Sequence, residues 1–262
     1  MKKLVITASV LAFITSIAYY MYMKTRSNVE TDDVDESESN EKLLFCKCDT
    51  ATIGISLNDK NRNKNSIIIG QSGSGKSYSF ILSNLLNGKI SAICVDPRNA
   101  LRRDYEKLCK EPKIRKTVDE LCAEPGVLFL SGEDATTHNV SELYNEIMSK
   151  ENRRAIVFFI DDYPELRHIP GFEAMLAAAD KNKIYFEIVV QTLAQLRAGN
   201  PYWQIVMSKC DNILMLSTNN DADIDSINEM RNLHITNVRQ DECVFISKNT
   251  MLCANKINAK SM

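Results

Sequence analysis

The chain has 262 residues with a formal net charge of −2, and 25% of its residues are charged. This balance excludes binding to nucleic acid through bulk positive charge, so any such binding must be local. The eight cysteines include no C-x-x-C pair and mostly lie in apolar runs, which indicates reduced, buried thiols rather than disulfides or a zinc site.

Residues 1–26 are expected to form a membrane anchor, because residues 4–23 are twenty consecutive residues without a charge. At about 1.5 Å per residue, a helix of this length crosses a hydrocarbon core about 30 Å thick. The competing interpretation is a cleaved signal peptide, with Lys2 and Lys3 as its basic region and Ser16-Ile17-Ala18 as the cleavage site. The length of the uncharged segment favours the anchor.

Residues 27–42 are expected to form a flexible linker, because this segment is rich in acidic residues and has almost no apolar ones. Such a composition repels itself and cannot bury a core. The remaining residues, 43–262, are long enough for one α/β domain. We expect this domain to begin with an antiparallel hairpin formed by residues 43–48 and 53–57.

A phosphate-binding sequence follows the hairpin. Residues 66–69 are an apolar run typical of a buried strand, and residues 78–86 have apolar positions at helical spacing. Between them the chain fits the P-loop pattern G-x-x-x-x-G-K-[ST]. In this pattern backbone N–H groups face the phosphates, the lysine reaches the β- and γ-phosphates, and the hydroxyl ligates Mg²⁺. The motif consists of Gly70, Gln71, Ser72, Gly73, Ser74, Gly75, Lys76 and Ser77. The expected cofactors are therefore ATP and Mg²⁺.

Strands and helices alternate after the P-loop. The expected strands are residues 91–95, 127–130, 155–160, 185–190 and 212–216, and the expected helices are residues 99–109, 172–180 and 221–231. This alternation predicts an α/β fold with a mostly parallel sheet and right-handed crossovers. Residues 242–256 are expected to add a second hairpin at the end of the chain.

Two aspartates, Asp161 and Asp162, directly follow the apolar strand at residues 155–160. Sheets of parallel strands place ligands at the carboxyl ends of those strands. A P-loop protein needs one acid there to hold Mg²⁺ and a second to orient or deprotonate water. We assign the first role to Asp161 and the second to Asp162. Gln191 directly follows another strand, so its amide is expected to face the same crevice.

The order of these motifs resembles that of the TraG/TraD-type coupling ATPases of conjugation and type IV secretion, a group of the FtsK/HerA-like P-loop superfamily. The resemblance covers about residues 65–217. It rests on residues 65–77, Cys94-Val95-Asp96-Pro97-Arg98, Phe159-Ile160-Asp161-Asp162-Tyr163, His168-Ile169-Pro170-Gly171-Phe172-Glu173, Val189-Val190-Gln191, Gln195-Leu196 and Lys209-Cys210-Asp211.

This resemblance implies a RecA-like ATPase domain in a homo-hexameric ring that passes single-stranded DNA, with a bound relaxase-type protein, towards the components of a secretion channel. It also implies roles for single residues: Lys76 and Ser77 bind phosphate and Mg²⁺, Asp161 binds Mg²⁺, Asp162 is the catalytic acid, and Gln191 senses the γ-phosphate. The protein is then expected in the cell (inner) membrane as a single-pass protein, with its ATPase domain in the cytoplasm where ATP is available.

The chain departs from the family pattern at three places. Asp162 stands where the family usually has glutamate, and Lys181 and Lys183 stand where it tends to have an arginine offered to the neighbouring subunit. The segment between the strands at residues 127–130 and 155–160 is too short for the helical domain that typical members insert. These departures support an alternative hypothesis, a slowly hydrolysing, nucleotide-binding membrane adaptor of a secretion or conjugation assembly.

Overall fold

The computed structural model describes residues 41–48, 51–60, 62–151, 153–166, 168–218, 220–247 and 250–261. The expected anchor at residues 1–26 and most of the expected linker at residues 27–42 lie outside these ranges. Within the described residues, no helix has both the length and the apolar character needed to span a bilayer.

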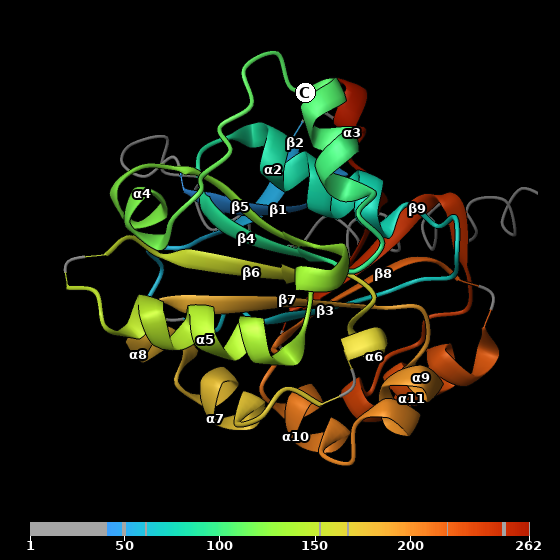
Figure 1. Cartoon of the computed structure of the whole chain (residues 1–262). Coiled ribbons are helices and arrows are strands. Elements are labelled where there is room, and N and C mark those ends of the chain that lie inside the picture. The colour runs from blue at the N-terminus through green and yellow to red at the C-terminus, as the bar shows by residue number, and fades with distance from the viewer. Residues whose placement is uncertain are drawn as a thin grey trace, which may run out of the picture. The chain divides into compact units, whose positions relative to one another are not determined.

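A ten-stranded sheet forms the centre of the described part of the chain (Figure 1). Its strands follow the order β2-β1-β10-β9-β8-β3-β7-β6-β4-β5. The six strands from β8 to β5 run parallel, and the other four add antiparallel pairings at one edge. The α/β fold with a mostly parallel sheet is thereby confirmed, as are the hairpins at the two ends of the domain.

The parallel strands are β8 (Asn212–Thr218), β3 (Ser66–Ile69), β7 (Ile184–Val190), β6 (Ile156–Ile160), β4 (Ser91–Asp96) and β5 (Gly126–Ser131). The antiparallel strands are β9 (Val238–Ser247), β10 (Thr250–Asn255), β1 (Lys42–Cys48) and β2 (Ala51–Ser56). Every residue of β3, β4, β6 and β7 is buried, because helices cover both faces of this part of the sheet.

Figure 1 shows which helices cover which face. One face carries α2 (Ser83–Asn87) and α3 (Leu101–Leu108), and the other carries α5 (Thr137–Met148), α7 (Phe172–Ala177), α9 (Leu193–Gly199), α10 (Trp203–Ser208) and α11 (Asp221–Arg231). Shorter elements are α4 (Val118–Ala123), α6 (Tyr163–Leu166), α8 (Ala179–Asn182), and the 3-10 turns η2 (Gly132–Asp134) and η3 (Ala259–Ser261).

Alternating side chains of the strands build two separate cores. On one face, residues such as Phe158 and Phe186 stack at 5.2 Å between ring centroids and pack within the cluster that includes α5 and α7. On the other face, the rings of Phe80 and Phe159 meet edge to face at 5.9 Å. The helix that bears Phe80 is therefore anchored directly above β6, which brings the segment after the P-loop close to the strand with the two aspartates.

Several helical segments differ from the sequence-based expectation, and α4, α9 and α10 are not among the predicted helices. The helix predicted at residues 78–86 already begins at Lys76, as the π-helical segment η1 (Lys76–Leu82), and continues as α2. The helix predicted at residues 172–180 is divided at Ala178, whose ψ of 3° leaves the helical region. Helix α5 was not predicted, although the side chain of Thr136 caps it by accepting the N–H of Asn139 at 3.1 Å.

Candidate nucleotide-binding site

The sheet topology brings the P-loop and the two aspartates to the carboxyl ends of neighbouring strands. Strand β7 lies between β3, which leads into the P-loop, and β6, which leads into the two aspartates. All three strands are parallel, so their carboxyl ends lie side by side. Gln191, the residue after β7, therefore lies between the P-loop and the aspartate pair, in the crevice where the sequence analysis expected it.

Two glycines give the P-loop its shape for different reasons. A Cβ atom on Gly70 would lie 2.5 Å from the carbonyl oxygen of Leu216 and 2.5 Å from the Ser74 hydroxyl oxygen, so no side chain fits there. Gly75 has a φ of 92°, in the left-handed region that favours glycine, and is the residue from which the helix starts. The backbone thus turns sharply and directs the first helical N–H groups outward, as an anion site requires.

Lys76 is held by the loop that precedes it. Its side-chain ammonium group donates to the carbonyl oxygens of Gly70 and of Gln71, the latter at 2.9 Å. Burial lowers the pKa of Lys76, while the charges of Asp162 and Asp161 act in the opposite direction. The cation is thus partly desolvated and faces two carboxylates, a setting in which phosphate oxygens make strong partners.

Ser77 and Asp161, the two residues assigned to Mg²⁺, lie in direct contact. The Ser77 hydroxyl donates to Asp161 Oδ2 at 3.0 Å, although 84 positions separate the two residues. Burial raises the pKa of Asp161 to about 6, with a further contribution from Asp162 and an opposing one from the Ser77 hydrogen bond. A buried carboxylate of this kind is costly to ionise, and a divalent cation next to it would remove that cost.

These two oxygen donors fit Mg²⁺, which binds proteins through one or two carboxylates and takes its other ligands from phosphates and water. Among the described residues, no group of three or more His, Cys, Asp and Glu side chains is placed to hold a metal ion. Ser77 and Asp161 would leave the other coordination positions of Mg²⁺ to phosphate oxygens and water.

Asp162 is fixed on both of its carboxylate oxygens. Gln191 Nε2 donates to Oδ1 at 3.3 Å, and Arg98 Nε lies 3.1 Å from Oδ2. The backbone of Asp162 has a φ of 46°, a left-handed conformation that is uncommon for a residue with a side chain. Strain of this kind is stored mainly at functional sites. The contact between Asp162 and Gln191 matches the sequence-based expectation, but the contact with Arg98 was not expected.

A cavity of about 500 Å³ opens beside Asp162. It is lined by Arg98, Asp162, Pro164, Glu165, Gln191, Gln195, Ala198 and Gly199. Sequence reasoning missed Arg98 and Glu165 as residues of the site. The available signal was the position of Arg98, two residues beyond the end of β4, because the carboxyl end of β4 lies next to that of β6.

Lys181 and Lys183, which stand where the family tends to have an arginine, lie at the amino-terminal end of β7, opposite the carboxyl end that faces the nucleotide site. Lys181 is in α8, and Lys183 directly precedes β7, whose seven residues separate it from Gln191. At about 3.3 Å per residue over eight steps, this places Lys183 about 26 Å from Gln191 of its own chain. Arg153 contacts the segment that contains these lysines. It donates to the carbonyl oxygen of Asn182 at 2.7 Å and to that of Lys150 at 3.1 Å.

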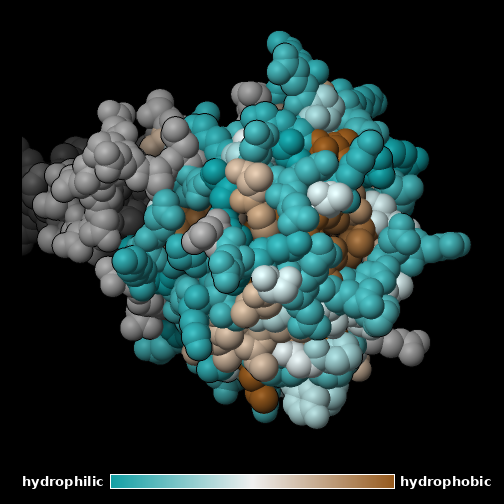
Figure 2. Space-filling view, turned by 60° about the vertical axis from the view of Figure 1, so that its left-hand side comes forward, coloured by the Kyte–Doolittle hydropathy of each residue, from teal (hydrophilic) through white to brown (hydrophobic). Residues whose placement is uncertain are grey.

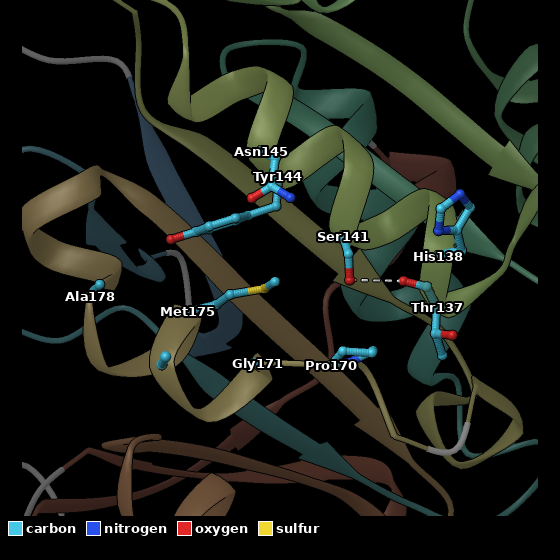
Figure 3. A pocket seen from close by; sticks show the side chains of 10 residues that line it. Thr137, His138, Ser141, Tyr144, Asn145, Pro170, Gly171, Met175 and Ala178 are labelled. Carbon is cyan, nitrogen blue, oxygen red and sulfur yellow. Dashed lines mark hydrogen bonds between the residues drawn. The ribbon is translucent and has the colours of Figure 1, made fainter.

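A second cavity, of about 680 Å³, lies between α5 and α7 and contains none of the predicted site residues (Figure 3). Its walls include Tyr144 and Met175, and the Ser141 hydroxyl donates to the carbonyl oxygen of Thr137 at 3.0 Å within α5. The face shown in Figure 2 is mostly hydrophilic, with hydrophobic residues in separate patches. The exposed large hydrophobic side chains among the described residues are Met148, Tyr202, Ile205 and Met230.

The fold and the geometry of this site resemble those of P-loop ATPases. Residues 155–230 match the family model described as the TraM recognition site of TraD and TraG. The resemblance to the TraG/TraD group is therefore confirmed over the segment that begins with β6 and ends in α11. No curated protein matches the chain.

Solved structures show the same fold over most of the chain. The genome packaging NTPase B204 of Sulfolobus turreted icosahedral virus 2, in complex with ATP-gammaS, is 18% identical, with a TM-score of 0.57 over 74% of this chain and 98% of that one. VirB4 of Thermoanaerobacter pseudethanolicus is 13% identical, with a TM-score of 0.59 over 84% and 97%. The cytoplasmic domain of the type VII secretion ATPase EccC of Thermomonospora curvata is 13% identical, with a TM-score of 0.58 over 85% of this chain and 27% of that one.

Proposed function

We propose that this protein is a membrane-anchored coupling motor, which uses ATP hydrolysis to recruit DNA or a DNA–protein substrate and move it towards a conjugation or type IV secretion channel. The observation that carries the proposal is the contact between Ser77 and Asp161, with Lys76 on one side and the pair of Asp162 and Gln191 on the other. Lys76, Asp161 and Asp162 are buried, and the cluster is assembled at three strand ends where a phosphate-binding loop places its ligand.

The chemistry follows from the positions of these groups. The P-loop N–H groups and Lys76 hold the phosphates, and Ser77 and Asp161 hold Mg²⁺, which neutralises charge on the phosphate oxygens when bound. Asp162, on the side of the cavity, accepts the proton of the attacking water, and Gln191 keeps the Asp162 carboxylate in place. Catalysis of phosphoryl transfer consists almost entirely of such positioning and charge stabilisation.

The nature of the cargo rests on the relatives. The family model that matches residues 155–230 is named for TraD and TraG, and B204 is a genome packaging NTPase. By analogy, we expect the cargo to be single-stranded DNA, or such DNA with a relaxase-type protein attached. The resemblance to the TraG/TraD group also implies a homo-hexamer, and in such a ring Lys181 and Lys183 are the candidates for contact with the nucleotide of a neighbouring subunit.

Phosphate release by the purified full chain, with and without single-stranded DNA, tests the motor. The native chain is expected to hydrolyse ATP faster in the presence of DNA, and Lys76→Ala is expected to abolish hydrolysis because it removes the charge that holds the phosphates. Indistinguishable rates for the native chain and Lys76→Ala would refute the proposal.

The second candidate function is a nucleotide-binding membrane adaptor with little turnover. It is favoured by the short side chain of Asp162 and by the connection between β5 and β6, whose described residues form η2 and α5 and no inserted helical domain. If the protein is an adaptor, Asp162→Asn leaves substrate transfer in cells nearly unchanged while Lys76→Ala abolishes it. An equal loss in both variants rejects the adaptor.

The membrane anchor is part of the proposal and is tested separately. The uncharged residues 4–23 and the acidic residues that follow them support a domain tethered at the cytoplasmic face of the cell (inner) membrane. Fractionation of cells that express the full chain, or a chain without residues 1–26, is expected to give membrane and soluble protein respectively. Recovery of the full chain in the soluble fraction would contradict the anchor.

A further inference from the structure

Arg98 bridges two carboxylates at the wall of the cavity beside Asp162. Its Nε atom lies 3.1 Å from Asp162 Oδ2 and 3.3 Å from Glu165 Oε1, and its Nη2 atom donates to the same Glu165 oxygen at 2.8 Å. The Arg98 side chain is 53% exposed, whereas the Asp162 side chain is 11% exposed. The guanidinium group thus lies at the solvent side of a nearly buried carboxylate, and Glu165 holds it there.

The backbone around Arg98 is fixed by hydrogen bonds. Asp96, the last residue of β4, is buried, and its Oδ2 accepts the N–H of Leu101 at 2.8 Å, which secures the start of α3. The carbonyl oxygen of Asp96 accepts the N–H of Asn99 at 3.0 Å, and Asn99 has a φ of 52°. A left-handed residue inside a hydrogen-bonded turn indicates that the position of this loop is strongly determined.

The end of β4 is also joined to the end of β6. The N–H of Asp161 donates to the carbonyl oxygen of Val95 at 3.0 Å, so the loop with Arg98 and the loop with the two aspartates keep a constant separation. The sheet therefore holds the backbones that carry Arg98 and Asp162, while Glu165 and Gln191 hold the two side chains. This arrangement lowers the entropic cost that an ordinary surface ion pair pays to hold its geometry.

We propose that Arg98 is a positioning residue for ATP hydrolysis, acting through Asp162; this rests on the function proposed above. An aspartate has one methylene less than the glutamate of the family, so its carboxylate must be aimed by its surroundings. Gln191 holds Oδ1 and Arg98 holds Oδ2, and the left-handed backbone of Asp162 sets the direction of the side chain. Each oxygen keeps a second lone pair with which to accept a proton.

Hydrolysis exchanges one bond to the γ-phosphorus for another. The oxygen atom of a water molecule forms a bond to the γ-phosphorus while the bond from that phosphorus to the β–γ bridging oxygen breaks, and the electron pair leaves with ADP. The water proton passes to the Asp162 carboxylate and then to the released phosphate or to solvent. Arg98 takes part in neither bond change, and its effect is confined to the orientation of the base.

The test compares three variants of the full chain by steady-state ATP hydrolysis. Arg98→Ala is expected to lower kcat at least about 10-fold with little change in KM for ATP, since Arg98 acts on the base and not on nucleotide binding. Arg98→Lys is expected to recover only part of this loss, because lysine keeps the charge but cannot span two carboxylates with a planar fork. The control is Arg102→Ala, which removes the same charge from an exposed pair with Glu106 and is expected to behave as the native chain.

A double-mutant cycle separates a role through Asp162 from a general structural role. In the Asp162→Asn background, Arg98→Ala is expected to cause no further loss of kcat. The inference is wrong if Arg98→Ala retains native kcat, or if it lowers kcat by the same factor in both backgrounds. If the native chain releases no more phosphate than Lys76→Ala, both the proposed function and the role of Arg98 are wrong. If the native chain hydrolyses ATP and Arg98→Ala does so equally well, only the role of Arg98 is wrong.

Discussion

Glu187 provides a quantitative test of the structure, because it is a carboxyl group at the centre of the sheet. It lies on β7, pairs with Ser66 of β3 in the strand register, and has no exposed surface. Neither of its carboxyl oxygens has a hydrogen-bond partner among the described residues, and the Ser66 hydroxyl donates instead to the carbonyl oxygen of Lys64 at 3.1 Å. Burial raises the pKa of Glu187 to about 8, against an opposing effect of the nearby Ser66 hydroxyl.

The sign of the resulting pH dependence follows from linkage. Below the ordinary pKa of 4.5, Glu187 is protonated in both the folded and the unfolded chain and has no effect. Above it, the unfolded chain loses the proton while the folded chain keeps it, so stability falls as pH rises, until the folded group also ionises near pH 8. The expected loss is about 1.4 kcal/mol per pH unit, or about 5 kcal/mol across the whole window.

Glu187→Gln removes this titration, so the difference in unfolding free energy between the native chain and the variant must change with pH. The assay is urea unfolding of the full chain from about pH 5 to about pH 9, followed by the fluorescence of Trp203, the only tryptophan. The slope of the difference is the test, because it does not depend on the absolute stability of the variant. Glu151→Gln, at an exposed position, is the control and is expected to give no slope. If the difference in unfolding free energy between the native chain and Glu187→Gln does not change with pH, the pKa of Glu187 is not raised by burial.

Three further predictions concern the site and its support. Gly70→Ala places a Cβ atom 2.5 Å from the Ser74 hydroxyl oxygen and is expected to weaken binding of a fluorescent ATP analogue at least about 10-fold. The control Gly132→Ala meets no atom within 4 Å but strains a φ of 60°, so it is expected to lower stability and leave affinity unchanged. Asp162→Asn is expected to lower kcat at least about 100-fold while ATP affinity is kept, and an unchanged kcat would exclude this residue as the base. Thr136→Ala removes the cap of α5 and is expected to cost about 1 kcal/mol in urea unfolding with no effect on nucleotide binding; loss of binding would show that α5 is coupled to the site.

Most residues of the nucleotide site could be predicted from the sequence. Gly70, Asp161 and Gln191 each directly follow an apolar strand, and the carboxyl ends of neighbouring parallel strands lie side by side. The P-loop and the aspartates could be assigned roles because phosphate and Mg²⁺ chemistry restricts the residue types at each position. The contact between Ser77 and Asp161 is the structural counterpart of that reasoning.

The order of the strands in the sheet could not be predicted from the sequence. Periodicity identifies a strand but not its neighbours, so the insertion of β7 between β3 and β6 became visible only in the structure. Arg98 was missed for the same reason, because its role depends on the adjacency of β4 and β6. Helix α5 could have been predicted from the sequence, because Thr136 followed by apolar positions at helical spacing is typical of a helix start.

The central claim is that Ser77, Asp161 and Lys76 form a working site for ATP with Mg²⁺. Phosphate release by the full chain, measured with ATP over a range of Mg²⁺ concentrations, tests it most directly. We expect the native chain to require Mg²⁺ for hydrolysis and Asp161→Asn to need a much higher Mg²⁺ concentration, because the variant lacks the carboxylate charge beside Ser77. An identical Mg²⁺ dependence of the native chain and Asp161→Asn would show that Asp161 does not bind the cation.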